Sequence, residues 1–380
     1  LAAFRNPEFY KAQAMRMPVW NKPRLIGCAE NYPQHIGLPR GCLDEVLDLL
    51  QENGIHPVLR EERLTGREVA VTFTGTLRSD QESAVGEMLK YEVGVLCAPT
   101  AFGKTVAAAS LIARRGISTL VLVHRTELLR QWQGRLENFL EFQKGSIGVI
   151  GGGKKKPSGM IDIAVMQSLS RREDLTDFLD QYGQIIVDEC HHLSAFSFER
   201  ILKQAKAKYV MGLTATPIRR DGHQPIIFMQ CGPIRYNAAR PESAPQKLEV
   251  WSKALIAPGI PENSPIQEVF RVLVNDAARN RQIAEDISAA YREGRKILVL
   301  TERTDHLPLL LETLGNDVEH CFVLHGRMSK KQRTSVLKEL DSLDESSPRI
   351  LLATGRLIGE GFDHPPLDTL VLAMPISWKG

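Results

Sequence analysis

Short apolar runs alternate with helical patterns between about residues 76 and 236, and this alternation restricts the fold more than any other feature. Several runs contain no polar alternation, which is typical of strands buried on both faces of a parallel sheet. Segments with helical spacing, such as Glu127 to Phe142, lie between them. The runs are Gly94 to Cys97, Thr119 to His124, Ile161 to Val165, Gln184 to Asp188 and Tyr209 to Leu213. This βαβ order predicts a doubly wound α/β domain.

A second alternating set predicts another α/β domain of the same kind. It follows a stretch rich in proline and alanine, which we interpret as a linker with one edge strand at Lys247 to Trp251. A helix is expected over Asp276 to Glu293, and we expect this domain to be incomplete. Its predicted strands are Lys296 to Thr301, Cys321 to Leu324, Arg349 to Ala353 and Thr369 to Ala373. We therefore predict a first domain at residues 69–236, the linker at 237–266 and the second domain at 267–380.

Residues 1–68 are interpreted as a small α+β module to which no chemistry is assigned. Several prolines, beginning with Pro7, predict an irregular start without a long helix. Helical spacing from Leu43 to Leu50, followed by Asn53-Gly54, predicts one helix with a C-terminal cap. Short strands are expected at Arg24 to Cys28, His56 to Arg60 and Val69 to Phe73.

The composition is that of a core-forming protein with two domains and an appendage, with 43% hydrophobic and 24% charged residues among 380. A net charge of +3 permits a nucleic-acid partner without indicating one. The six cysteines form no C-x-x-C pair, so we expect reduced thiols and a cytoplasmic location rather than disulfides or structural zinc. No apolar run approaches the roughly 20 residues of a membrane span. Because the chain starts at Leu1, we expect it to be part of a longer protein.

The segment from Ala98 to Thr105 predicts a phosphate-binding loop. It follows an apolar run and precedes a helical one, and this order of strand, glycine-containing loop, Lys-Thr and helix forms a cradle for nucleotide phosphates. In such a cradle Lys104 reaches the β- and γ-phosphate oxygens and Thr105 ligates Mg²⁺. Ala98 stands where the usual pattern has its first glycine. The predicted nucleotide contacts of the loop are Thr100, Gly103, Lys104 and Thr105.

Two adjacent carboxylates, Asp188 and Glu189, end the strand predicted from Gln184 onward. Ligands bind at the carboxyl ends of parallel strands in such folds. We predict that Asp188 holds Mg²⁺ and that Glu189 orients and deprotonates the attacking water, with Lys104 as the third catalytic residue. The alternative is a strand that simply ends in acidic residues.

Three nearby features have competing interpretations. Cys190, His191 and His192 suggest a metal site, but three adjacent side chains cannot converge on one zinc ion. We therefore expect His191 to bridge the nucleotide site and a coupling motif. Trp132 lies in an amphipathic helical segment and is interpreted as a core or interface residue rather than a base-stacking platform. Lys154 to Lys156 are interpreted as a basic loop, either solvated or in contact with a phosphate backbone.

The phosphate-binding loop and the two carboxylates make the chain resemble superfamily 2 helicases and translocases of the DEAD/DEAH type. The D-E-x-H motif of that group matches Asp188 to His191. The resemblance runs from about residue 76 to the end and implies two RecA-like doubly wound parallel-sheet domains. It also implies that Arg78 and Gln81, in the segment R-S-D-Q, select adenine. Further residues implied by the motifs of the first domain are His191, Thr214 and Thr216 for coupling, and Arg125 and Gln167 for nucleic-acid contact.

The resemblance continues in the second domain with the segments Val299 to Arg303, Leu324 to Arg327 and Gly359 to Asp363. It implies that Arg303 and Thr354 contact the nucleic-acid strand. It also implies that Gly361 and Asp363 lie at the ribose or the metal of the bound nucleotide.

A closer resemblance is to repair-type helicases of the xeroderma-pigmentosum-B kind. Their short Arg-x-Asp element corresponds to Arg219 to Asp221, and Arg219 and Arg220 are candidate DNA contacts. Arg220 stands where that group has glutamate, which argues against a strand-separating role for the element. The phrases APTAFGKT, VHRTELLRQW and TATPIRRDGHQP also resemble the helicase part of TOTE conflict-system proteins. Those are prokaryotic primase–helicase fusions, so this resemblance implies a fused primase domain upstream.

The expected function is that of an ATP-dependent helicase or translocase, an ATP hydrolase that uses Mg²⁺ and moves on or unwinds DNA rather than RNA. ATP is expected between the two domains. The sixth motif of the family supplies an arginine finger, and the chain ends at Trp378 to Gly380, where that motif would follow. Two alternatives stay open. One is a double-strand DNA translocase of a restriction or defence system that does not separate strands, and the other is an ATP- and DNA-binding fragment that is inactive without the sixth motif.

Overall fold

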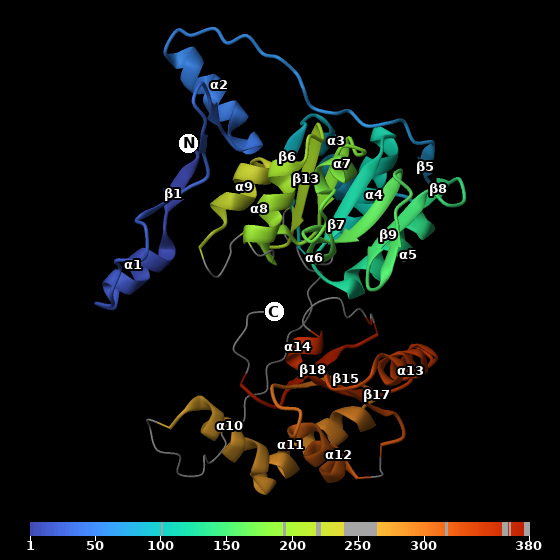
Figure 1. Cartoon of the computed structure of the whole chain (residues 1–380). Coiled ribbons are helices and arrows are strands. Elements are labelled where there is room, and N and C mark those ends of the chain that lie inside the picture. The colour runs from blue at the N-terminus through green and yellow to red at the C-terminus, as the bar shows by residue number, and fades with distance from the viewer. Residues whose placement is uncertain are drawn as a thin grey trace. The chain divides into compact units, whose positions relative to one another are not determined.

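The computed structural model of the chain consists of two compact units, residues 1–246 and 247–380. It describes residues 1–99, 102–192, 195–217, 222–238, 264–315, 318–358, 364 and 366–375. Figure 1 shows the first unit in blue to yellow and the second in orange and red. The edge strand predicted at Lys247 to Trp251 lies outside the described residues. The predicted domain boundaries at residues 68 and 236 stay predictions.

The first unit is built around an eight-stranded sheet in the order β10-β9-β11-β7-β12-β13-β6-β14. The apolar runs form β6 (Val93–Cys97), β7 (Thr119–Val123), β11 (Ile161–Val165), β12 (Gln184–Val187) and β13 (Tyr209–Thr214). Two parallel strands that the sequence patterns do not predict extend this set, β9 (Ile147–Gly151) and β14 (Ile234–Asn237). The predicted doubly wound α/β fold is confirmed.

Both faces of the sheet are buried, as the apolar strands predict. On β12, Ile185 and Val187 belong to one hydrophobic core and Ile186 to the other. The helices divide between the same two cores, so each face is covered. One face carries α3 (Ser79–Leu89), α4 (Lys104–Arg115) and α5 (Thr126–Phe139), and the other carries α6 (Met166–Leu169), α7 (Leu175–Leu179), α8 (Ala195–Gln204) and α9 (Pro225–Cys231) (Figure 1).

The helix predicted to reach Phe142 ends at Phe139, so its last turn was wrongly predicted. The next three residues form β8 (Leu140–Phe142), which pairs antiparallel with β5 (Val71–Phe73). Leu140 stays buried in the core in this extended conformation. The backbone therefore loses no burial and gains inter-strand hydrogen bonds in place of helical ones.

The three lysines predicted to form a basic loop form a strand instead. β10 (Lys154–Lys156) pairs antiparallel with β9 and ends the large sheet. Gly152 and Gly153 both have a positive φ between the two strands. Such angles suit glycine and allow the chain to reverse direction in a tight hairpin.

The N-terminal module contains two small antiparallel pairs and two helices. The helix predicted around Leu43 to Leu50 is confirmed as α2 (Leu43–Glu52). A second helix begins at Pro7, where the sequence predicts irregular chain, because proline suits the first helical turn and the Asn6 side chain caps Glu8 N at 3.1 Å. The strand predicted at His56 to Arg60 is wrong, since those residues pair with no strand in the described chain and Val58 is 97% exposed. The remaining elements are α1 (Pro7–Ala14), β1 (Ala3–Arg5) paired with β2 (Leu25–Gly27), β3 (Glu30–Asn31) paired with β4 (Ile36–Gly37), and the 3₁₀ turn η1 (Arg40–Cys42).

Arg40 attaches this module to the large sheet domain. Its guanidinium donates to the carbonyl oxygens of Leu202 at 2.8 Å and Ala207 at 3.1 Å, and also to that of Ala205. These carbonyls lie at and just beyond the C-terminal end of α8, where backbone acceptors lack helical partners. Burial lowers the pKa of the Arg40 guanidinium. One half-buried side chain therefore satisfies several acceptors of the neighbouring layer.

The second unit has a four-stranded parallel sheet in the order β16-β17-β15-β18. Its strands match the four predicted runs to within one residue, and the helix predicted from Asp276 forms with Asp276 as its cap. Buried residues again divide into two cores, one on each face. The elements are α10 (Ile266–Asn275), α11 (Ala277–Arg292), β15 (Lys296–Thr301), α12 (His306–Leu314), β16 (Cys321–Leu324), α13 (Lys330–Asp341), β17 (Arg349–Thr354), α14 (Gly355–Ile358) and β18 (Thr369–Leu372).

All six cysteines are free thiols, and five of them are buried. Across the residues that the structure describes, no helix combines the length and the apolar character needed to cross a bilayer.

Candidate active site

The loop between β6 and α4 places Lys104 inside the first unit. Gly103 has a φ of +80°, a left-handed conformation that glycine adopts without strain, and it precedes the first residue of α4. The buried Lys104 side chain follows directly, and its Nζ donates to the Ala98 carbonyl oxygen at 3.1 Å. Thr105 lies in the first turn of α4, where free N–H groups and the helix dipole favour an anion. Thr100, the remaining predicted contact, lies outside the described residues.

The two predicted carboxylates follow β12 at the carboxyl edge of the sheet. Asp188 is buried, and its two oxygens accept different donors, Glu189 N at 3.0 Å and the Trp132 indole Nε1 at 2.7 Å. Burial and the neighbouring Glu189 carboxylate raise the pKa of Asp188 to about 6, although the Trp132 hydrogen bond and Lys104 oppose the rise. Asp188 is thus held in one orientation, and its charge is costly to bury.

Glu189 lies between Lys104 and His191. Its Oε1 is 3.5 Å from Lys104 Nζ, and its Oε2 is 3.4 Å from His191 Nδ1. Within the described part of the chain, Oε2 is buried and accepts no hydrogen bond. The backbone φ of Glu189 is +45°, a conformation that costs a residue with a side chain of order 1–3 kcal/mol and is common at functional sites. This buried oxygen can still accept a hydrogen bond, either from a water molecule or from a ligand of a bound metal ion.

His191 connects the carboxylates to the end of β13. Its Nδ1 lies 2.8 Å from Thr214 Oγ1. The Thr214 hydroxyl also donates to the Thr216 carbonyl at 2.8 Å and accepts from Thr216 N at 3.2 Å. Because a hydroxyl has one proton, this arrangement makes His191 Nδ1–H the donor to Thr214. The three residues predicted to couple are therefore brought together.

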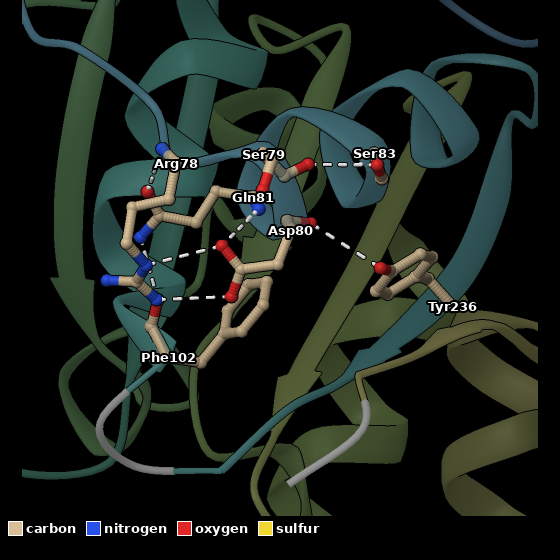
Figure 2. A network of polar contacts seen from close by, with 7 residues as sticks. All are labelled: Arg78, Ser79, Asp80, Gln81, Ser83, Phe102 and Tyr236. Atoms are coloured by element: carbon tan, nitrogen blue, oxygen red, sulfur yellow. Dashed lines mark hydrogen bonds and ion pairs between the residues drawn. The ribbon is translucent and has the colours of Figure 1, made fainter. Parts of the chain in front are cut away.

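Arg78 and Gln81 converge on the phosphate loop (Figure 2). Gln81 Nε2 and Arg78 donate to the Phe102 carbonyl oxygen at 2.7 and 2.8 Å, and Gln81 Oε1 accepts from Arg78 N at 2.9 Å. Gln81 is only 3% exposed. Gln81 Oε1 and Nε2 can each make a second hydrogen bond, which recognition of adenine would need. Adenine selection by Arg78 and Gln81 stays a prediction. Its observed contacts hold the loop next to Gly103.

The predicted nucleic-acid contacts of the first unit lie along the carboxyl edge of the sheet. Arg125 follows β7 and Gln167 follows β11, which are paired strands, and both side chains are exposed. Arg219 and Arg220 lie outside the described residues. Two candidates are thus placed near each other on one edge, and their contact with nucleic acid stays a prediction.

In the second unit Arg303 follows β15 and Thr354 ends β17, and these two strands are paired. Arg303 is engaged by Asp305 at 3.0 and 2.8 Å and by Gln267 at 3.2 Å. Thr354 is 8% exposed. Gly361 and Asp363 lie outside the described residues. Three of the five N–H donors of Arg303 are used in these contacts, so a phosphate would have to share or replace them.

Trp132 is the contact that the sequence interpretation missed. It is buried in the core as predicted, but its indole N–H is hydrogen-bonded to Asp188 rather than merely enclosed. A buried indole N–H generally has an acceptor. A tryptophan on the buried face of the helix after β7 therefore predicts a polar partner at the end of a neighbouring strand.

Both units of the chain are similar to known protein families. Residues 74–219 match the family "Type III restriction enzyme, res subunit", and residues 279–377 match "Helicase conserved C-terminal domain". A DNA 3'-5' translocase XPB2 of Sulfurisphaera tokodaii is 33% identical over 44% of this chain and 37% of its own length. A DNA 3'-5' helicase XPB of Kineococcus radiotolerans is 33% identical over 68% of this chain and 47% of its own length. The chain thus spans less than half the length of both relatives.

The fold comparison agrees with the architecture described above. The crystal structure of the Pyrococcus furiosus Hef helicase domain matches with a TM-score of 0.52 and 15% identity, over 78% of this chain and 89% of that one. At this identity the match concerns the fold alone.

Proposed function

The chain belongs to the superfamily 2 helicases, with one conserved domain in each unit, and from this premise we propose that it is an ATP-hydrolysing motor that moves on or unwinds DNA. The observation that carries the proposal is the unbroken set of contacts from Lys104 through Glu189 and His191 to Thr214. It links the phosphate loop to the carboxylates and to the end of β13. A strand that merely ended in acidic residues would not need these partners.

Lys104 and α4 would bind the phosphates. Lys104 Nζ now contacts Ala98 and approaches Glu189. A γ-phosphate competes for the same ammonium group, because it offers more negative charge than a carbonyl and a single carboxylate. ATP binding would therefore draw Lys104 away from Glu189 and leave that carboxylate free to accept a proton.

Asp188 and Thr105 fit a magnesium ion, which prefers carboxylate and hydroxyl oxygens. Bound Mg²⁺ would neutralise charge on the β- and γ-phosphates. The two hydrogen bonds to Asp188 fix its carboxylate for this purpose before the ion arrives. Glu189 Oε2, with no hydrogen bond in the described residues, would accept the proton of the attacking water.

Thr214 and His191 would pass the change at Glu189 to the strand-binding edge. His191 Nδ1 can donate to either Glu189 Oε2 or Thr214 Oγ1, which lie 3.4 and 2.8 Å away. Loss of the Lys104 contact makes Glu189 the stronger acceptor. A shift of His191 toward Glu189 would release Thr214 and loosen its hydrogen bonds to Thr216.

DNA is proposed as the track because relatives above 30% identity carry the names DNA translocase and DNA helicase. The match to the restriction-enzyme res subunit favours a second candidate, a motor that moves along double-stranded DNA without separating it. Strand displacement and triplex displacement, measured on the same preparation, distinguish the two. Stimulation of phosphate release by DNA and by RNA, compared at equal nucleotide concentration, tests the choice of track.

The test of the site is DNA-stimulated phosphate release by Glu189→Gln. Loss of a general base typically costs a factor of about 10² to 10⁴ in rate, so we expect a fall in that range while ATP binding persists. Glu141→Gln is the matched control, since Glu141 is an exposed carboxylate on β8. A Glu189→Gln protein that hydrolyses ATP at the wild-type rate would refute the assignment. Binding of ATP and DNA without phosphate release by the wild type would favour the third candidate, a chain that binds both ligands without turnover.

A further inference from the structure

The indole of Trp132 joins the helix that starts at the strand-binding edge to the carboxylate of Asp188. Trp132 is 2% exposed, and its Nε1 donates to Asp188 Oδ2 at 2.7 Å. The other oxygen, Oδ1, accepts from Glu189 N at 3.0 Å. Both oxygens are thereby fixed by donors from different elements, α5 and the turn after β12. Of these two donors, only the indole belongs to α5.

Helix α5 is tied to its neighbours along its length and beyond its C-terminal end. Leu129 and Leu136 pack in the same core as Trp132. Beyond the helix, β8 pairs with β5, and the Phe139 and Phe73 rings are stacked with centroids 6.3 Å apart. The C-terminal end of α5 is therefore held by β8 and by the Phe139 ring.

The exposed Arg125 occupies the N-cap position of α5, two residues after β7, and its side chain makes no capping hydrogen bond. Trp132 is two helical turns further along, about 10 Å at 1.5 Å per residue. The predicted phosphate contact and the Asp188 contact therefore belong to one rigid element. A shift of α5 on binding of a phosphate at Arg125 would therefore alter the geometry of the indole hydrogen bond to Asp188.

We infer that Trp132 is a positioning residue that holds Asp188 in the orientation for Mg²⁺–ATP and transmits the binding of a nucleic-acid strand from Arg125 to that carboxylate. The inference rests on the proposed function and adds a route of communication within the first unit. Coupling between two sites is reciprocal, so Mg²⁺–ATP must change the affinity for DNA by the same factor as DNA changes the affinity for Mg²⁺–ATP. Residues that orient metal ligands typically alter metal affinity about 10- to 100-fold when replaced.

The test compares Trp132→Phe, which removes the N–H donor and keeps an aromatic ring, with Phe178→Leu. Phe178 is a buried aromatic residue in the core on the opposite face of the sheet, so its replacement lowers stability without touching Asp188. A fluorescent ATP analogue is titrated at several Mg²⁺ concentrations, with and without a DNA oligonucleotide, and thermal unfolding is recorded for each protein. None of these readouts depends on turnover.

For Trp132→Phe we expect the Mg²⁺ concentration at half-maximal nucleotide binding to rise about 10-fold or more. Nucleotide binding without Mg²⁺ should stay unchanged, and the factor that couples DNA to nucleotide should fall toward one. Phe178→Leu should keep wild-type Mg²⁺ dependence and coupling at a comparably lowered unfolding temperature. If Trp132→Phe behaves like Phe178→Leu, Trp132 is a core residue only and the inference is wrong. A wild type that binds no nucleotide would instead refute the proposed function, and the inference with it.

Discussion

Replacement of Gly103 by alanine tests the contact between the phosphate loop and Gln81. A Cβ at Gly103 would lie 2.6 Å from Gln81 Nε2, closer than real Cβ contacts. Nε2 is the end of a flexible side chain, so Gln81 can move away, but only by giving up its 2.7 Å hydrogen bond to Phe102 O. The left-handed φ of +80° adds its own cost for alanine.

The expected loss of stability follows from these two terms. A left-handed conformation costs alanine about 1–2 kcal/mol. A buried hydrogen bond contributes about 0.5–1.5 kcal/mol. The free energy of unfolding of the Gly103→Ala protein should therefore be lower by about 2–3 kcal/mol. Its affinity for an ATP analogue should fall at least about 10-fold, because the loop loses the hydrogen bond from Gln81 to Phe102 O.

Two other glycines separate the terms. Gly116 also has a positive φ, +58°, but its Cβ would have no neighbour closer than 3.7 Å, so Gly116→Ala should show the backbone cost alone. Gly86 lies inside α3 with open space around it, and Gly86→Ala should stabilise by about 0.5–1 kcal/mol. Urea unfolding followed by circular dichroism, with nucleotide titration, measures all three. Equal destabilisation by Gly103→Ala and Gly116→Ala, with nucleotide affinity unchanged, would refute the role given to Gln81.

Three further changes test other parts of the structure. Arg40→Met should lower the unfolding free energy by about 3 kcal/mol, because three carbonyl oxygens that accept from its half-buried guanidinium are left without donors. It should also speed proteolysis between residues 53 and 62, and an unchanged digestion pattern would contradict this attachment. Burial lowers the pKa of His306 to about 4, so stability should be full above the ordinary pKa near 6.5 and fall as pH drops toward 4, and His306→Gln should remove that slope in thermal unfolding at pH 5 and 7.5. Asp188→Asn should raise the unfolding temperature at pH 7.5, where the wild-type carboxylate is charged above its pKa of about 6, and the gain should shrink at pH 5; a constant gain would show that the pKa of Asp188 is not raised.

The strands of the large sheet were predictable because burial on both faces leaves a plain apolar signal. Ile185, Ile186 and Val187 have no polar neighbour between them, and any other arrangement would expose some of them. The end of α5 was not predictable by the same rule. Leu140 is buried whether the backbone there is helical or extended, so only the distant partner Val71 to Phe73 decides between them.

Proline misled the prediction of the N-terminal module. Pro7 was interpreted as a break, yet at the first helical position it needs no N–H partner and its φ suits a helix. His56 to Arg60 has a β-like composition, but strands depend on a neighbour, and none pairs with them in the described chain. Local composition does not contain the information that decides either case.

The motifs predicted which residues to look for at the candidate site, and their roles stay predictions, but the sequence did not predict their hydrogen bonds. The motifs identify Lys104, Glu189, His191 and Thr214, and the structure brings these four into one set of contacts. That Gln81 would turn its amide to Phe102 depends on how α3 packs on α4. The same holds for Trp132 and Asp188, which lie on different elements and meet only after the sheet has formed.

The strand β10 at one end of the large sheet has a consequence for how copies of the protein behave together. The end strand of an open sheet offers unpaired N–H and C=O groups to which another chain can add. Here that strand consists of three consecutive lysines, so a second copy approaching edge to edge would bring like charges together. The repulsion acts within a Debye length, about 10 Å at 0.1 M salt. Copies of the protein at high concentration can therefore lie close without their sheets joining, and raised salt concentration weakens this protection against aggregation.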